Sequence, residues 1–201
     1  MSSKINKPIA AQSFELVRAR IVEILGTELE NQVVNFGNYD VDVNDVWMER
    51  WVPFNSDTEI PCINVCLGNG DYSGKSMPQQ DGVYQFNIDC YHKAKTSTGT
   101  RADEAAMIKL QRLMGVCRSI LDNPVYKALD FTPPFIISVR CVSVQIKDPN
   151  PPDATSAIMG RIVYEVKVSE TTPLKDGVEF SGIDSQWKIA LTDKGYKYTI
   201  E

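Results

Sequence analysis

The sequence has 201 residues, of which 43% are hydrophobic and 23% are charged, a composition typical of a globular domain with a sizeable core. The formal net charge of -5 argues against a protein that binds nucleic acid on its outer surface, although it is compatible with a channel through which DNA slides. No apolar run reaches the roughly 18 residues expected of a membrane helix. The first residues contain no apolar signal core, which argues against export.

The first expected element is an amphipathic helix that follows a flexible polar arm, residues 1–12. Ser13 is a suitable N-cap, and the stretch 13–32 repeats apolar side chains at helical spacing. The stripe consists of Phe14, Val17, Ile21, Ile24 or Leu25, and Leu29.

Two strands are predicted after a connection over residues 31–45. They cover residues 46–54 and 60–67, and the turn-like Asn55-Ser56-Asp57 between them favours a hairpin. Pro53 indicates an edge strand or a strand end.

A long exposed loop is predicted over residues 68–82, because four glycines and a proline interrupt this stretch and it has no apolar period. Loops of this length inside a compact domain are usually functional or disordered. We therefore take Asp71, Tyr72 and Lys75 as candidate residues of an assembly interface.

The same stretch ends in Gly74-Lys75-Ser76 and resembles a phosphate-binding loop. The resemblance fails because Asn69 stands where the first glycine is required. It also fails because a proline and a strand follow, whereas the phosphate of such a loop sits on a helix N-terminus. Nucleotide binding is therefore not predicted.

The clearest elements are a strand over residues 83–92 and a helix over residues 100–121. The strand alternates apolar residues with Gln, Asn and Asp, which indicates one buried face. Thr100 is expected to cap the helix. The helix carries one apolar stripe that must pack on something, and the strand is the expected partner. The stripe consists of Ala102, Ala106, Leu110, Leu113, Cys117 and Ile120.

Two long strands, residues 135–147 and 157–169, are expected to close the domain. The first alternates Ile137, Val139 and Cys141 with Ser138, Arg140 and Val142. The second places Ile158, Ile162, Tyr164, Val166 and Val168 on one face. Three prolines stiffen the tip over residues 148–153, and its Asn150 and Asp153 are further candidate interface residues.

The domain is expected to span residues 13–172, followed by a polar C-terminal extension over residues 173–201. The extension is too short and too polar to form its own core, so its large apolar side chains must bury against the domain, a neighbouring subunit or a partner. Phe180, Trp187 and Tyr196 are therefore candidate interface residues. The part from residue 186 to residue 200 can form a small hairpin.

The residues capable of chemistry form no convincing constellation. Cys62, Cys66, Cys90 and His92 contain metal-ligating atoms, but two residues four apart on a strand are roughly 13 Å apart, too far for zinc ligands. We interpret the five cysteines as free and mostly buried thiols. His92 is the only histidine and lacks an activating neighbour, which disfavours a general base.

The remaining charged groups support the same interpretation. Asp40, Asp42 and Asp45 are spaced like calcium ligands, but the turn glycine and the distal glutamate of a calcium loop are missing. The helix charges are expected to face solvent or, in a ring, to meet acidic residues of a neighbour; they are Arg18, Arg20, Lys109, Arg112 and Arg118. We predict no catalytic residue, no cofactor and no metal.

The predicted order is helix, three strands, helix, two strands and a tail, which favours an α+β fold with two helices on one face of an antiparallel or mixed sheet. This order, with the segment FNIDCYHKA before the long helix, resembles the tail terminator proteins of tailed bacteriophages, also called tail-completion or head–tail joining proteins. The resemblance covers about residues 10–172 and rests on the order of elements.

The resemblance implies a non-enzymatic virion protein that is assembled in the host cytoplasm. It implies a homo-hexameric ring that caps the tail tube protein, stops tube polymerisation and offers a docking surface to head connector and neck proteins. DNA would pass through the ring without sequence-specific binding. In contractile tails the C-terminal extension would reach the sheath protein.

Two alternatives stay open. The chain can be another neck, connector or tail-assembly protein, or it can be a small-ligand-binding or enzymatic domain with the same fold. The native mass would separate a ring from a catalytic monomer. Binding to purified tail tubes would place the protein on one side of the head–tail joint.

Overall fold

The structure is a computed structural model that describes residues 8–52, 54–55, 58–76, 79–93, 101–132, 134–147, 157–171, 183–188 and 195–200. In chain order the elements are α1 (Ser13–Phe36), the short 3-10 helix η1 (Tyr39–Val41), β1 (Asp45–Met48), β2 (Cys62–Ser76), β3 (Gln79–Lys93), α2 (Ala102–Leu121), the 3-10 helix η2 (Pro124–Tyr126), β4 (Ile136–Lys147), β5 (Ala157–Thr171), β6 (Ile183–Lys188) and β7 (Gly195–Ile200).

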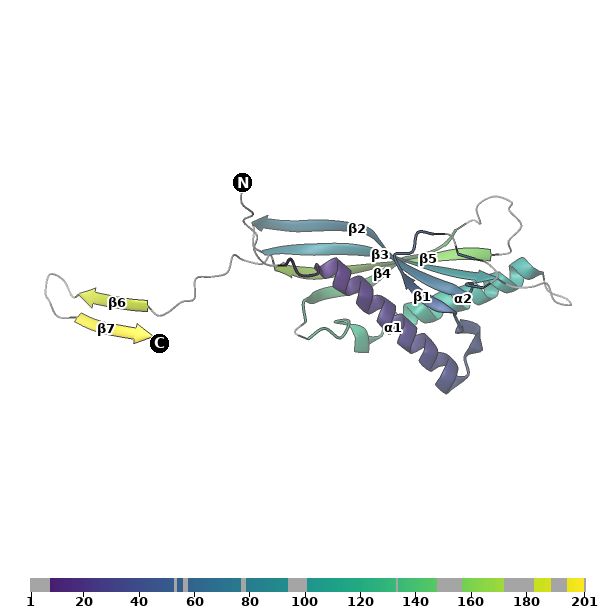
Figure 1. The fold of residues 1–201 in the computed structure, drawn as a ribbon, viewed down its shortest axis with the longest axis horizontal. Coiled ribbons are helices and arrows are strands. Elements are labelled where there is room, and N and C mark those ends of the chain that lie inside the picture. Colours follow the sequence, from purple (N-terminus) through teal and green to yellow (C-terminus); the bar gives the residue numbers. More distant parts are fainter. Residues whose placement is uncertain are drawn as a thin grey trace.

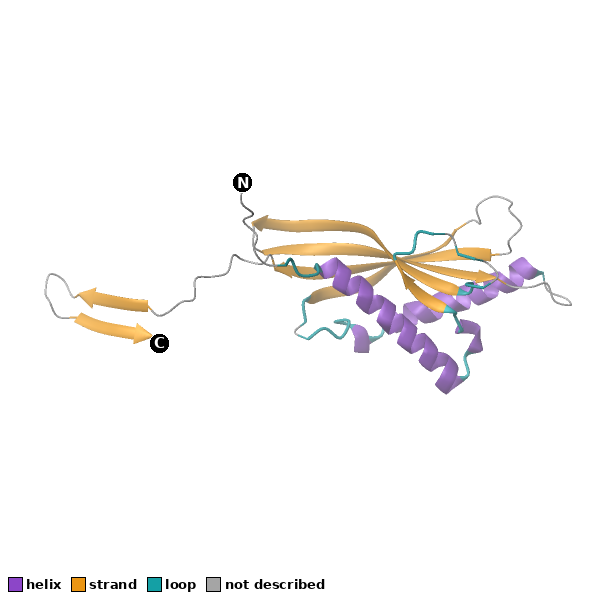
Figure 2. Ribbon diagram, viewed as in Figure 1, coloured by secondary structure: helices purple, strands orange, loops and turns teal. Residues whose placement is uncertain are grey.

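Five strands form one mixed sheet in the order β1-β2-β3-β5-β4, and β6 pairs with β7 in a separate two-stranded sheet (Figure 1). Within the large sheet only β1 and β2 are parallel. Both helices pack on one face, with α1 on β1 and β2 and α2 on β3 and β5 (Figure 2). The predicted α+β fold is therefore confirmed. We call the opposite face of the sheet the outer face.

The pairing of β3 with β5 explains where the core lies. Fifteen residue pairs run from Gln79 opposite Thr171 to Lys93 opposite Ala157 without a register shift. The predicted alternation is confirmed, because the even-numbered side chains of both strands point to the helices and are buried. The aromatic and aliphatic members are Tyr84, Phe86, Ile88, Ile158, Ile162, Tyr164, Val166 and Val168.

Both predicted helices form and bury their apolar stripes, but their caps differ from the prediction. In α1 the capping residue is Gln12, whose side chain and that of Glu15 form a capping box, while the Ser13 hydroxyl donates to Glu170 instead. In α2 the N-cap is Arg101, so the predicted cap at Thr100 is wrong. The apolar stripes are unaffected, because moving the start of a helix by one residue does not change the spacing of the side chains within it.

The predicted hairpin over residues 46–67 is wrong, because β1 and β2 run parallel. Glu49 adopts a left-handed conformation (φ 53°) directly after β1, and its carboxylate accepts hydrogen bonds from the Arg18 guanidinium and the Leu67 backbone N–H. The chain then crosses the outer face before β2 begins. Residues 51 and 52, predicted as strand, lie exposed in this crossing segment, with Trp51 81% exposed.

The predicted loop over residues 68–82 is also wrong, because most of it continues β2 and β3. Two of its glycines, Gly70 and Gly82, make room for one aromatic ring. A Cβ atom at Gly70 would lie 3.0 Å from a Tyr84 ring atom, and a Cβ atom at Gly82 would lie 2.9 Å from another. Glycine within a strand often marks such a close approach.

Two predictions for the end of the chain need refinement. The predicted alternation of β4 is wrong at Ile137, which is 51% exposed, because register shifts next to it and after Cys141 interrupt the pairing with β5. The predicted C-terminal hairpin forms, but its first strand is Ile183–Lys188.

Leu113 provides a test of the core. Its side chain is fully buried on α2, so Leu113→Ala should lower the free energy of unfolding by about 2–5 kcal/mol in chemical denaturation. Ile108→Ala on the same helix is the matched control, because Ile108 is 61% exposed and its truncation should cost less than about 0.5 kcal/mol. Equal losses for the two variants would contradict the described packing.

Candidate functional site

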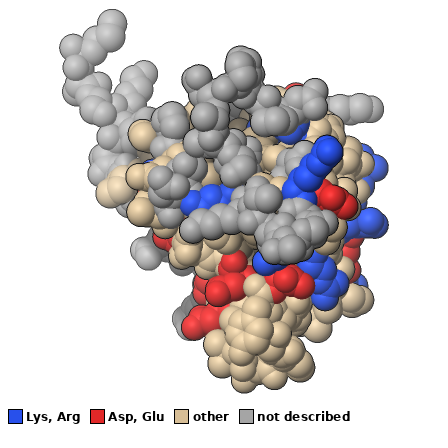
Figure 3. Space-filling model, turned by 90° about the vertical axis from the view of Figure 1, so that its right-hand side faces the viewer, with Lys and Arg blue, Asp and Glu red and all other residues tan. Residues whose placement is uncertain are grey.

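The outer face of the sheet carries charges that are paired within the chain. Arg161 binds Asp89 with two short hydrogen bonds of 2.6 and 2.7 Å across β3 and β5. Further along the face, Arg140 lies 2.7 Å from Glu165, and Lys167 lies 2.8 Å from Asp81. Basic and acidic side chains are likewise interspersed at the end of the molecule shown in Figure 3. These pairs leave a polar face without a large excess of either sign.

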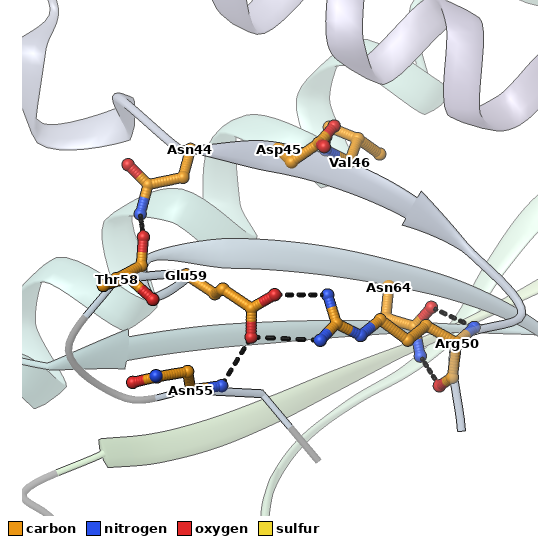
Figure 4. A network of polar contacts seen from close by, with 8 residues as sticks. All are labelled: Asn44, Asp45, Val46, Arg50, Asn55, Thr58, Glu59 and Asn64. Atoms are coloured by element: carbon orange, nitrogen blue, oxygen red, sulfur yellow. Dashed lines mark hydrogen bonds and ion pairs between the residues drawn. The ribbon is translucent and has the colours of Figure 1, made fainter. Parts of the chain in front are cut away.

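Arg50 fastens the crossing segment to the outer face (Figure 4). Its guanidinium donates to both carboxylate oxygens of Glu59, at 2.6 and 3.0 Å. It also lies over the rings of Trp47 and Phe54, at 4.6 and 4.7 Å from their centroids. The Arg50 backbone exchanges two hydrogen bonds with the Asn64 side chain on β2. We interpret this cluster as structural, because both terminal nitrogens of the guanidinium and both oxygens of the carboxylate bind groups of the chain itself.

The crossing segment explains why small polar residues of β2 are buried on the outer face. Cys62, Asn64 and Cys66 point to this face and are nonetheless buried. Burial raises the pKa of the Cys62 thiol to about 12 and that of the Cys66 thiol to about 11. Both thiols are therefore protonated near neutral pH, and a protonated thiol is neither a nucleophile nor a metal ligand.

The residues considered for zinc lie on opposite sides of the sheet. Cys62 and Cys66 face outward, whereas Cys90 and His92 face the helices. Asp40, one of the acids considered for calcium, instead lies 3.9 Å from Lys109 on α2. Within the described ranges no group of three or more His, Cys, Asp or Glu residues is arranged to hold a metal ion.

His92 is buried beneath the N-terminal half of α2. Its pKa is lowered first by burial and then by the charge of Lys109, while a hydrogen bond with the Lys93 backbone and the charge of Asp40 act in the opposite direction. Its Nδ1 atom has no hydrogen-bond partner among the described residues. The ring is therefore neutral at pH 7 and behaves as a core side chain.

A groove lies between α1 and the segment that leads into β1. It has a volume of about 630 Å³ and is formed by α1 and the segment from Val41 to Val46. Its apolar lining includes Val22, Leu29, Val33, Val34, Val43 and Val46, and its acidic lining consists of Glu23, Glu30, Asp42 and Asp45. No lysine or arginine lines it. A smaller groove of about 390 Å³ lies between α1, α2 and η2 and includes Arg112.

The structure brings together few of the predicted interface residues. Asp71 and Tyr72 are exposed on the long end of β2, where the Tyr72 ring meets Tyr84 edge-on at 5.9 Å. Lys75 is on the same strand. Trp187 and Tyr196 are direct partners across β6 and β7. Asn150, Asp153 and Phe180 lie outside the described residues.

The sequence analysis missed the groove and the Arg50 cluster. The groove depends on the contact between α1 and residues 41–46, and the Arg50 cluster depends on the change of direction at Glu49. The predicted helix charges are mostly paired inside the chain: Arg18 with Glu49, Arg20 with Glu23 and Asp130, Lys109 with Asp40, and Arg118 with Asp122.

Comparison with models of known protein families yields no match, and comparison with curated proteins yields none either. Among the described residues, neither helix combines the length and the apolar character needed to cross a bilayer. The case for a function therefore rests on the sequence resemblance and on the surfaces described above.

His92 predicts a pH dependence of stability. Its pKa is lower in the folded state than the ordinary 6.5, so the unfolded chain binds the proton more tightly and acidification favours unfolding. The contribution is fully present above about pH 6.5 and is lost as the pH falls from there toward the lowered pKa, with a slope of at most ~1.4 kcal/mol per pH unit.

Because His92 is the only histidine, His92→Leu should reduce the pH dependence of the free energy of unfolding between pH 7.5 and 5.5. The measurement is urea denaturation across this range for both proteins. An unchanged slope in the variant would show that another group titrates there.

Proposed function

We propose that this chain is a structural assembly protein of a phage tail, a tail terminator whose ring caps the tail tube and receives the head connector. The observation that supports this most is the agreement between the folded arrangement and the one that the resemblance implies. Residues 13–171 form a sheet with both main helices on one face, in the expected order. The virion location, the hexamer and the tube, neck and sheath partners belong to this proposal.

The chemistry of the described residues supports assembly over catalysis. The thiols of Cys62 and Cys66 are protonated, His92 is enclosed in the core, and the charges of the outer face neutralise one another. In contrast, several large apolar side chains are exposed, and clusters of such residues mark protein contacts. They include Val34 and Phe36 at the end of α1, Tyr39 in η1, Met48 at the end of β1, and Trp51 and Val52 in the crossing segment.

The proposal is tested by native mass spectrometry of the purified chain, followed by electron microscopy with purified tail tubes. A closed ring that binds one end of the tube and prevents further growth is the expected result. A ring that binds isolated head connectors and ignores tubes would assign the protein to the head side of the joint. A monomer that stays monomeric in the presence of tubes and connectors would contradict the proposal.

The C-terminal hairpin supports a second contact surface. In its register Trp187 lies opposite Tyr196, Ser185 opposite Tyr198, and Ile183 opposite Ile200. An isolated two-stranded hairpin is marginally stable in water, so contact with a partner would stabilise it.

Removing residues 174–201 should therefore leave the five-stranded domain folded while weakening ring stability or partner attachment. The thermal unfolding temperature and the affinity for tubes would be measured for the truncated and full-length chains. Trp187→Ala is the milder variant, with Ile108→Ala as a control exposed elsewhere on the domain. Failure of the truncated chain to fold would place the extension in the core, and unchanged assembly and attachment would show that it is dispensable.

A further inference from the structure

The five-stranded sheet ends in two edges of opposite charge. At one edge, β4 carries Arg140 and Lys147 and no acidic residue. At the other edge, the groove beside β1 is lined by four acidic side chains and no basic one, although Glu23 among them also pairs with Arg20. Strand edges present unpaired backbone groups that pair readily with another chain. Arg140 pairs with Glu165 within the chain, and Arg140 and Lys147 both lie on the outer face. Asp45 of β1 lies opposite Cys62 and shares that face, so the two edges can match in charge there.

The edge strand β4 has an apolar face that the helices leave uncovered. Val144 lies opposite Ile162 of β5, and Ile146 lies opposite Gly160, so both side chains are on the helix side of the sheet. The Ile162 side chain is fully buried there, yet Val144 is 49% exposed and Ile146 is 43% exposed. The reason is that α2 packs mainly on β3 and β5 and only touches β4.

The groove beside β1 offers the missing cover. One of its walls is α1, whose Val33 and Val34 line the groove, and Val34 is 71% exposed. A strand added to the free edge of β1 would reach this groove, because Asp45 and Val46 of β1 line it. Its helix-side residues would then pack against α1, as those of β1 and β2 already do.

We propose that β4 of one copy pairs with the free edge of β1 in the next copy, with Val144 and Ile146 covered by the α1 helix of that copy. β1 and β2 run parallel, and the remaining neighbours in the sheet are antiparallel, so β4 runs opposite to β1. Copies that continue one another's sheet in this way form an antiparallel contact. This contact would join the subunits of the proposed ring, and it rests on the proposed function for the closure of that ring.

The charges favour this head-to-tail contact over a two-fold contact. Pairing β4 with β4 would place side by side two strands that have no acidic residue, and pairing two grooves would bring together eight carboxylates, counting four from each copy. Like charges across an interface cost free energy, whereas opposite charges fix the register. A head-to-tail contact repeats through the same two surfaces and closes into a ring when the rotation between copies allows it.

The test uses two full-length variants that each damage one surface with the same charge. Val144→Glu places a carboxylate on the uncovered face of β4, and Val34→Glu places one in the acidic groove. Both native side chains are exposed, so circular dichroism and thermal unfolding should match the wild type. Each variant alone should run as a monomer in native mass spectrometry at a concentration where the wild type forms rings. Ile108→Glu, an equally drastic change on α2, should keep the ring.

Mixing the two variants gives the decisive measurement. The intact groove of the Val144→Glu chain can accept the intact β4 of the Val34→Glu chain. The two surfaces left over each carry an added carboxylate and cannot bind a further copy. The expected product is a one-to-one dimer with twice the 22.5 kDa chain mass and no larger assembly. Homodimers of either single variant, or no association in the mixture, would overturn the proposed pairing.

The remaining outcomes separate this inference from the proposed function. Rings that persist in both variants would overturn the inference and leave the ring proposal standing. Loss of tube binding with an intact ring in Val34→Glu would assign the groove to a tube protein instead of a second copy. A wild-type chain that never forms rings, alone or on tubes, would overturn both. If Val144→Glu fails to fold, Ile146→Glu repeats the test at the same face.

Discussion

The structure depends on the unbroken register between β3 and β5. Because side chains alternate along a strand, a slip of one residue would expose the apolar set of β3 and bury its polar set. Fifteen consecutive pairs without a shift keep Tyr84, Phe86 and Ile88 under the helices and keep Asp89 beside Arg161 on the outer face. The core and the charge pairs are thus two consequences of the same pairing. α1 and α2 then bury their stripes on the surface that this register creates.

The two helices do not cover all five strands of the sheet, and the uncovered parts shape the surface of the protein. Two helices cover β1, β2, β3 and β5, so β4 retains exposed Val144 and Ile146, and α1 leaves a groove beside the short β1. On the outer face, the crossing segment held by Arg50 and Glu59 covers only part of β2. The surfaces available for contact with other molecules are therefore mainly the edges of the sheet. Such edges suit the proposed assembly role, because strand edges pair readily with another chain.

The candidate interface could be predicted only in part. The polar extension with its aromatic residues was visible in the sequence, because seven large apolar side chains in a short polar segment have no core of their own. The groove was not visible, because its lining comes from α1 and from residues 41–46, which meet only after the chain has folded. The glycine-rich stretch misled the prediction for a physical reason. Gly70 and Gly82 occur in a stretch that reads as a loop, but both lie against the Tyr84 ring, and the contact of Gly70 with that ring forms only when β2 pairs with β3.

The sequence by itself determined the elements whose signal is periodic. The 3.6-residue stripes of α1 and α2 and the two-residue alternation of β3 and β5 are local properties, and each requires one buried face wherever the element is placed. Only the tertiary structure decided the direction of β1, the length of β2 and the exposure of Ile137. The direction depends on Glu49, whose left-handed backbone is held by Arg18 and by the Leu67 N–H, residues distant from it in the chain. Local spacing specifies which side of an element must be buried, and long-range contacts specify which partner buries it.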